Sequence, residues 1–109
     1  MNSIRETDWR VFRDLHGALM EQFCERVLEE VAQAANNAKQ DASKRFSTVA
    51  RLVRERAKDL NDLADHRRST AFLIIARMYN PEKLFLPDEF ERFSQEIRDQ
   101  IMGVRTLWE

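Results

Sequence analysis

The stretch RRSTAFLIIARMYN, residues 67–80, decides how the rest of this sequence has to fold. Six consecutive residues within it, Ala71 to Ala76, are apolar, although 34% of the 109 residues are charged. A helix with one apolar stripe can lie on a protein surface, but a helix that is apolar all round has to be covered from every side. The fold therefore depends on which part of the molecule covers this run.

The overall composition predicts long helices joined by few turns. Gly and Pro occur only twice each, whereas the helix formers Ala, Leu, Glu and Arg are plentiful. A chain of this length forms one domain with a modest core, and strand-like alternation of apolar and polar residues is missing from the sequence. We therefore predict a single all-α domain over residues 1–109.

Charge and cysteine content limit the classes of function. The formal net charge is -1, so bulk charge gives no reason to expect nucleic acid or an acidic membrane as partner. The one cysteine, Cys24, leaves no pair for an internal disulfide and suits the reducing cytosol. No secretion signal is recognisable at the start, and the apolar run is far shorter than the about 20 residues of a membrane span. We expect a cytoplasmic protein without membrane contact.

Three helices are predicted from the spacing of apolar residues. The first covers about residues 8–37 and carries a stripe that begins at Trp9 and continues in steps of three and four. The second covers about residues 42–79, with apolar residues at multiples of seven. The third covers about residues 87–108 and starts at Pro87, which suits the first turn of a helix. The apolar register of the second helix consists of Phe46, Val53, Leu60 and Ile74.

The second helix has one weak point, the polar patch DHRRS at residues 65–69, which places Arg67 on the core side. The helix bends or restarts there if Ser69 caps a new helix. If it continues, the first two helices form a long antiparallel hairpin around residues 38–39. The apolar run then projects past the start of the first helix by about 15 Å at 1.5 Å per residue, and the third helix covers only one flank of it.

A second copy of the chain is the simplest cover for the other faces of the run. Two projecting ends that cross about a two-fold axis complete a four-helix bundle, whereas a bare patch would be an aggregation hazard. The sequence therefore predicts a homodimer whose interface consists of residues in this run. These residues are Ala71, Phe72, Leu73, Ile74, Ile75 and Met78.

No catalytic residue, metal site or cofactor is predicted. Gly17 and Gly103 are isolated, which excludes a phosphate-binding glycine loop. His16 lies in the apolar stripe of the first helix and is expected to be buried and structural, whereas His66 is expected on a solvated face. Neither histidine has the inward Glu-x-x-His partner of a di-iron bundle. Cys24, at the edge of the stripe, is expected to be a small buried hydrophobic residue.

Basic residues concentrate in the second helix. Residues 39–58 carry seven basic and two acidic side chains, and Lys44, Arg51 and Lys58 recur at intervals of seven on its exposed side. We name these three residues the basic ridge. They could bind phosphates in a nucleic-acid-associated regulator, but a solvated surface beside acidic helices explains them more simply.

Acidic side chains form one row on each of the first two helices. Inward carboxylates from adjacent helices hold Mg²⁺ in helical nucleotide hydrolases, but both rows are predicted to point away from the core. A solvated surface is again the preferred interpretation, and a magnesium-dependent nucleotide hydrolase stays an alternative. The rows are Glu21, Glu25 and Glu29 on the first helix, and Glu55, Asp59 and Asp62 on the second.

These observations favour a non-catalytic helical module for interaction or oligomerisation. We expect a homodimeric regulatory or adaptor protein that binds an unidentified protein partner and needs no cofactor. The two alternatives, a nucleic-acid-associated regulator and a nucleotide hydrolase, depend on the basic ridge and on the acidic rows respectively.

Overall fold

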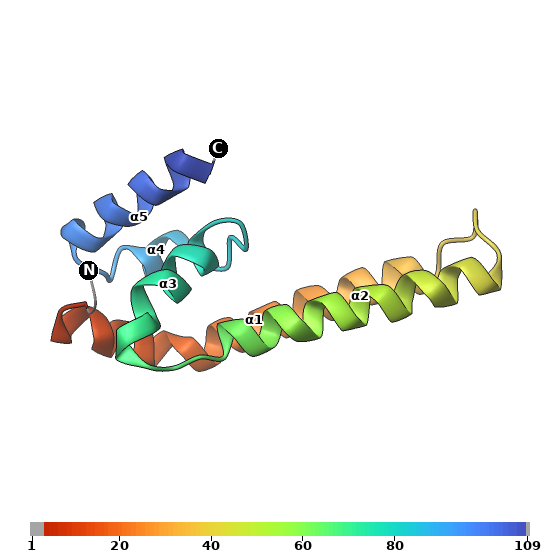
Figure 1. The fold of residues 1–109 in the computed structure, drawn as a ribbon, viewed down its shortest axis with the longest axis horizontal. Helices are drawn as coiled ribbons and strands as arrows, with labels where there is room; N and C mark the ends of the chain where they lie inside the picture. The colour runs from red at the N-terminus through yellow and green to blue at the C-terminus, as the bar shows by residue number, and fades with distance from the viewer. Residues whose placement is uncertain (1–3, 109) are drawn as a thin grey trace. The chain divides into compact units, whose positions relative to one another are not determined.

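The computed structural model describes residues 4–108, and the side chains of residues 4–103. The described chain is mostly helical (77%) and contains no strand, which confirms the predicted helical class. A 3-10 turn, η1 (Arg68–Thr70), precedes the third helix. In chain order the helices are α1 (Glu6–Ala35), α2 (Ala42–Leu63), α3 (Ala71–Tyr79), α4 (Pro87–Phe90) and α5 (Gln95–Trp108) (Figure 1).

The chain divides into two compact units. Unit 1 consists of Met1–Leu19 and Asp65–Glu109, and unit 2 consists of Met20–Ala64. The helix α1 is continuous from Glu6 to Ala35, so its first half belongs to unit 1 and its second half to unit 2.

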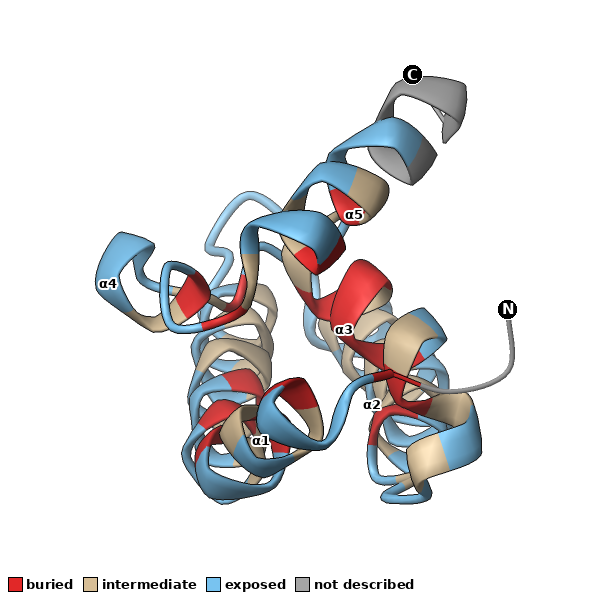
Figure 2. Cartoon of the chain, turned by 90° about the vertical axis from the view of Figure 1, so that its left-hand side faces the viewer, coloured by how far each residue is buried: buried red, intermediate tan, exposed pale blue. Residues whose placement is uncertain are grey.

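Unit 1 contains most of the buried apolar side chains. α3 packs against α5, and both helices carry buried positions (Figure 2). Spacings of three and four place these residues on one face of α1 and one face of α5. The buried residues of unit 1 include Phe12, Leu15 and Leu19 of α1, Ile74, Ile75 and Met78 of α3, and Ile97 and Ile101 of α5, together with Leu84 and Phe93 between the helices.

The prediction of one helix over residues 42–79 is wrong, because α2 ends at Leu63. The carboxylate of Asp65 accepts hydrogen bonds from the backbone N–H of Arg67 at 3.3 Å and from its guanidinium at 3.0 and 2.9 Å. These short-range bonds favour a turn over a continuing helix, and they lower the pKa of Asp65 to about 2. Arg67 is therefore exposed, instead of lying on the core side.

Arg68 contributes a second reason for this break. Its guanidinium donates two hydrogen bonds to the carbonyl oxygen of Ile4, at 3.1 and 2.8 Å, and forms an ion pair of 2.8 Å with Glu6. The side chain thus connects the turn before α3 to the segment that leads into α1. Ser69 does not cap the new helix, since Thr70 is the residue that directly precedes α3. The side chain of Thr70 makes no capping hydrogen bond.

The prediction of one helix over residues 87–108 is also wrong. α4 and α5 are separated by a turn at residues 91–94. Ser94 lies directly before α5, and its hydroxyl oxygen accepts a hydrogen bond from the N–H of Ile97 at 3.3 Å. A serine in this position caps the following helix, so the apolar phase continues across the break although the helix does not.

Most of the apolar run is covered by unit 1 itself. Ala71, Ile74, Ile75 and Met78 are buried in unit 1, whereas Phe72 is half-buried and Leu73 is 65% exposed. The expectation that a second chain has to cover the run is therefore wrong for these four buried residues. The helix break explains the difference, because α3 is free to pack on α5 instead of projecting as the end of α2.

In unit 2 the second half of α1 and α2 lie side by side, joined by a loop at residues 36–41 (Figure 1). Asp41 caps α2, since its carboxylate accepts a hydrogen bond from the N–H of Lys44 at 2.9 Å. The guanidinium of Arg45 donates a hydrogen bond of 2.8 Å to the carbonyl oxygen of Ala35, at the end of α1. These bonds fix the register of the two helices next to the loop.

Candidate functional site

An apolar groove with a volume of about 340 Å³ lies between the two helices of unit 2. Spacings of three and four place its lining residues on one face of each helix. The lining comes from Phe23, Cys24, Val27, Leu28 and Val31 of α1 and from Val53, Arg56, Ala57 and Leu60 of α2.

The groove exposes large apolar side chains. Leu28 is 63% exposed and Val53 is 47% exposed. Phe46, which lies seven residues before Val53 on the same face of α2, is 76% exposed. Within residues 20–64, all of which are described, the buried apolar side chains are Phe23 and Leu63. Unit 2 therefore presents an apolar face of α2 that its own two helices do not cover.

The apolar face continues from the groove towards the loop. A second hollow, of about 270 Å³, lies beside Phe46 and Val49. These two residues, together with Val53, Ala57 and Leu60, follow one another along α2 in steps of three and four. Their spacing predicted a core register for Phe46 and Val53, but both side chains are exposed in the structure.

Arg56 contributes the charge in the groove lining. Its guanidinium forms ion pairs with Asp59 at 3.1 Å and, across the two helices, with Glu30 at 3.2 Å. Its positive charge is thus matched on the side of the groove where α1 and α2 meet. The aliphatic part of such a side chain is free to contribute apolar surface.

The two helices of unit 2 carry opposite net charges. Residues 20–35 of α1 hold four acidic and one basic side chain, and α2 holds six basic and three acidic side chains. The net charges are -3 and +3 respectively. The three residues of the basic ridge, Lys44, Arg51 and Lys58, are all exposed on α2.

The acidic rows do not form a metal site in the described part of the chain. No group of three or more His, Cys, Asp or Glu side chains among those residues could hold a metal ion. Glu21, Glu25 and Glu29 are exposed on α1, and Glu55 and Asp62 are exposed on α2. Asp59 is half-buried and pairs with Arg56. Cys24 is also half-buried and belongs to the groove lining.

The histidines form an aromatic cluster in unit 1. The rings of His16 and His66 stack with centroids 4.5 Å apart, and His66 also contacts Trp9 at 5.6 Å and Phe12 at 5.9 Å. Burial lowers the pKa of His66, and the nearby positive charges of His16 and Arg13 lower it further.

Sequence reasoning missed this cluster because it assumed a continuous second helix. His66 follows the end of α2 and packs its ring against the stripe of α1, although much of the residue is exposed. His16 is half-buried and contacts Phe12 edge-on at 5.2 Å, so it lies against the core of unit 1 without being fully enclosed.

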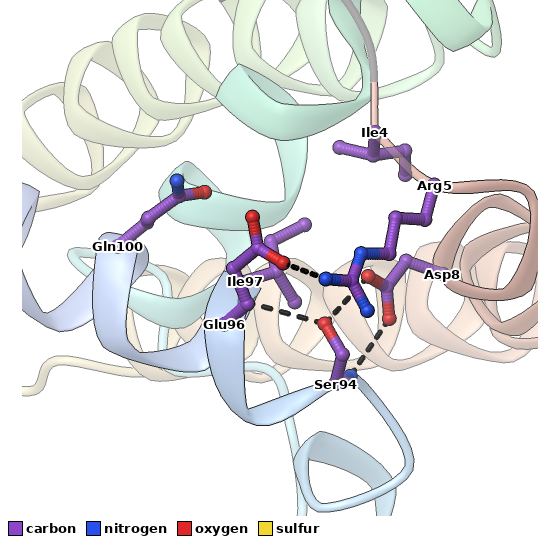
Figure 3. A pocket seen from close by; sticks show the side chains of 7 residues that line it. All are labelled: Ile4, Arg5, Asp8, Ser94, Glu96, Ile97 and Gln100. Atoms are coloured by element: carbon purple, nitrogen blue, oxygen red, sulfur yellow. Dashed lines mark hydrogen bonds and ion pairs between the residues drawn. The ribbon is translucent and has the colours of Figure 1, made fainter.

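A second cluster of polar residues lines a hollow of about 130 Å³ in unit 1 (Figure 3). The carboxylate of Asp8 is 3% exposed and accepts hydrogen bonds of 2.7 Å from both the N–H and the hydroxyl of Ser94. Arg5 and Glu96 form an ion pair at the edge of the hollow. Because Asp8 is engaged at the start of α5, this cluster joins two helix ends and offers no uncommitted acid or base.

In comparisons with known proteins, no protein-family model, no curated protein and no solved structure matches the chain, so the role of the groove is inferred from its own residues. Among the described helices, none combines the length and the apolar character that crossing a membrane would require.

Proposed function

We propose that this chain is a non-catalytic helical interaction module that assembles into a homodimer through the apolar groove of unit 2. The observation that carries the proposal is the exposure of Leu28, Val53 and Phe46 along one side of two paired helices. Contiguous exposed apolar surface on a water-soluble domain marks a place where another surface docks. A groove between two helices accepts the apolar face of further helices.

The energetics of unit 2 support self-association. Two helices cannot enclose a core between them, and helical bundles reach closure with about four. Burying Leu28, Val53 and Phe46 would contribute about 1.5–3 kcal/mol per side chain, and a two-fold dimer buries each of them twice. Because the three side chains are 47–76% exposed before association, about 6–11 kcal/mol of this free energy remains to be gained, which is comparable with association costs of about 4–15 kcal/mol.

This proposal keeps the predicted homodimer but moves its interface. Ala71, Ile74, Ile75 and Met78 are buried in unit 1, so they are not available to a second chain without rearrangement. The completed helical bundle would form from two copies of unit 2 instead. The basic ridge then acts as surface charge beside an acidic helix, and we do not assign it to phosphate binding.

Equilibrium sedimentation tests the proposal. At tens of micromolar the wild-type chain should have twice the 13.0 kDa mass of the monomer. Leu28→Glu and Val53→Glu place a charge in the groove and should each give a monomer whose helical circular dichroism is retained.

Leu73→Glu provides a matched control. Leu73 is 65% exposed on α3, and Leu28 is 63% exposed in the groove, so the two substitutions add the same charge at equally accessible positions. The Leu73 variant should stay dimeric. A monomeric wild type, or a dimer that is lost in Leu73→Glu and kept in Leu28→Glu, would overturn the proposed interface.

A further inference from the structure

Charged side chains of opposite sign flank the two outer edges of the groove. On α1, Glu21 and Glu25 lie three residues before the groove residues Cys24 and Leu28. This spacing puts them next to the lining, on the side of α1 turned away from α2. Both carboxylates are exposed. We call Glu21 and Glu25 the acidic rim.

The edge formed by α2 is basic. Arg54 and Lys58 each follow a groove residue, Val53 and Ala57 respectively, by one position. One position corresponds to about 100° of helix rotation, which here leads away from α1, since Arg56 on the other side of the lining pairs with Glu30. Arg54 and Lys58 are both exposed, and we call them the basic rim.

Two face-to-face arrangements of paired helices have two-fold symmetry. If the axis runs parallel to the helices, α1 of each copy faces α2 of the other, and both loops lie at the same end. If the axis runs across the helices, α1 faces α1, α2 faces α2, and the loops lie at opposite ends. Both arrangements keep neighbouring helices antiparallel, so apolar packing and helix dipoles do not decide between them.

Charge does decide between these arrangements. With the axis parallel to the helices, the acidic rim of each copy lies against the basic rim of the other, on both sides of the interface. With the axis across the helices, the acidic rims meet each other and the basic rims meet each other. Like charges brought together disfavour an arrangement and thereby select its competitor. The net charges of the helix segments, -3 for residues 20–35 and +3 for α2, act in the same direction.

We infer that the occupant of the groove is a second copy of this chain with its loop at the same end, so that α1 faces α2 and the acidic rim pairs with the basic rim. This inference rests on the proposed dimer and adds its orientation and its recognition residues. It also gives two of the three residues of the basic ridge a role, because Lys58 belongs to both sets and Arg51 lies one turn from Arg54 along the same edge.

Charge reversal tests the pairing. The variants Glu21→Lys/Glu25→Lys and Arg54→Glu/Lys58→Glu should each weaken the dimer about 10–100-fold at low ionic strength. Combining all four substitutions restores opposite charges across the interface and should return the dissociation constant to within a few-fold of the wild type. Equal dissociation constants for the wild type and both double variants would overturn the inference.

A matched control changes the same net charge elsewhere. Glu91→Lys/Asp99→Lys alters two exposed carboxylates in unit 1 and should leave the dissociation constant unchanged. If this variant weakens the dimer as strongly as Glu21→Lys/Glu25→Lys does, net charge and not rim pairing controls association, and the inference is wrong.

Distances between spin labels, measured by pulsed electron paramagnetic resonance, test the orientation of the two copies independently. Gln40 lies in the exposed loop, and an unnatural amino acid that carries a spin label at this position gives one label per chain and leaves the groove residue Cys24 unchanged. Loops at the same end should place the labels less than about 25 Å apart, given interaxial distances of about 10 Å. Loops at opposite ends should separate the labels by more than about 35 Å, since the 22 residues of α2 span about 33 Å. A dimer with the long distance would overturn this inference and leave the proposed function intact, whereas a monomer would overturn both.

Discussion

The carboxylate of Asp8 accepts two hydrogen bonds of 2.7 Å from Ser94, a residue 86 positions away in the sequence. Ser94 in turn caps α5 by accepting a hydrogen bond from the N–H of Ile97. The carboxylate of Asp8 also lies beside the first turn of α5, where the helix dipole favours negative charge. The start of α1 therefore determines where the last helix of the chain begins (Figure 3).

Replacing Asp8 with Ala should lower the free energy of unfolding by about 2–3 kcal/mol. The substitution leaves the N–H and hydroxyl of Ser94 without their acceptor in a half-buried position. Asp8→Asn should cost less, because its amide oxygen still accepts one hydrogen bond. Urea unfolding followed by circular dichroism measures both changes.

Asp14→Ala is the control on the same helix. The carboxylate of Asp14 forms an exposed ion pair of 3.6 Å with Arg92, which should contribute less than about 1 kcal/mol. Similar losses in all three variants would contradict a special role for Asp8.

The sequence was informative wherever structure depends on neighbouring residues. The spacing of apolar residues predicted α1 and the start of α2 to within two residues at each boundary, because helix periodicity is local. The break after α2 was raised only as an alternative at residues 65–69, and the break between α4 and α5 was not predicted. The first break depends on the hydrogen bonds between Arg68 and Ile4, which are 64 positions apart in the sequence. The second depends on the hydrogen bonds between Ser94 and Asp8, which are 86 positions apart. No local pattern reports such pairs.

The candidate groove was only partly accessible from the sequence. Phe46 and Val53 were identified as one apolar face of a helix, and the structure places them on one face of α2. Their exposure could not be predicted from the same spacing, because an apolar stripe is identical whether a neighbouring helix covers it or not. The opposite error occurred for Ile75, which seemed to need a second chain and is covered by its own unit.

Acidification should destabilise unit 1 through His66. The folded state holds the pKa of His66 below the 6.5 of a free histidine, so the unfolded chain binds a proton more readily. The contribution of neutral His66 to the free energy of unfolding is therefore fully present above about pH 6.5. It is lost as the pH falls through 6.5 towards the lower pKa that His66 has in the folded state. His66→Phe keeps a ring in the stack and removes the titration. Between about pH 7.5 and 5.5 the unfolding free energy of the wild type should fall more steeply than that of the variant. Parallel profiles would contradict this assignment.

Arg68→Met should lower the free energy of unfolding by about 1–2 kcal/mol. The substitution keeps most of the aliphatic stem but removes the two hydrogen bonds to the carbonyl oxygen of Ile4 and the ion pair with Glu6. Arg67→Met is the matched control, because Arg67 is exposed and its ion pair is with Asp65, two residues away. That variant should leave the free energy of unfolding nearly unchanged, because an exposed ion pair is screened by water. Faster amide exchange at the start of α1 in the Arg68 variant alone would locate the effect, and equal stability losses in the two variants would contradict it.

The apolar run can be divided experimentally between its own unit and a second chain. Ile75 is completely buried and Leu73 is 65% exposed, although both belong to the same short helix. Ile75→Ala should cost about 2–4 kcal/mol, because it removes buried methyl groups and leaves a cavity, whereas Leu73→Ala should change stability by less than about 0.5 kcal/mol. Because a dimer interface makes stability depend on protein concentration, both variants should be unfolded over a hundredfold range of concentration. If the run were covered by a second copy, Leu73→Ala would be as costly as Ile75→Ala, and its cost would vary with concentration. A large, concentration-dependent cost for Leu73→Ala would return the interface to α3.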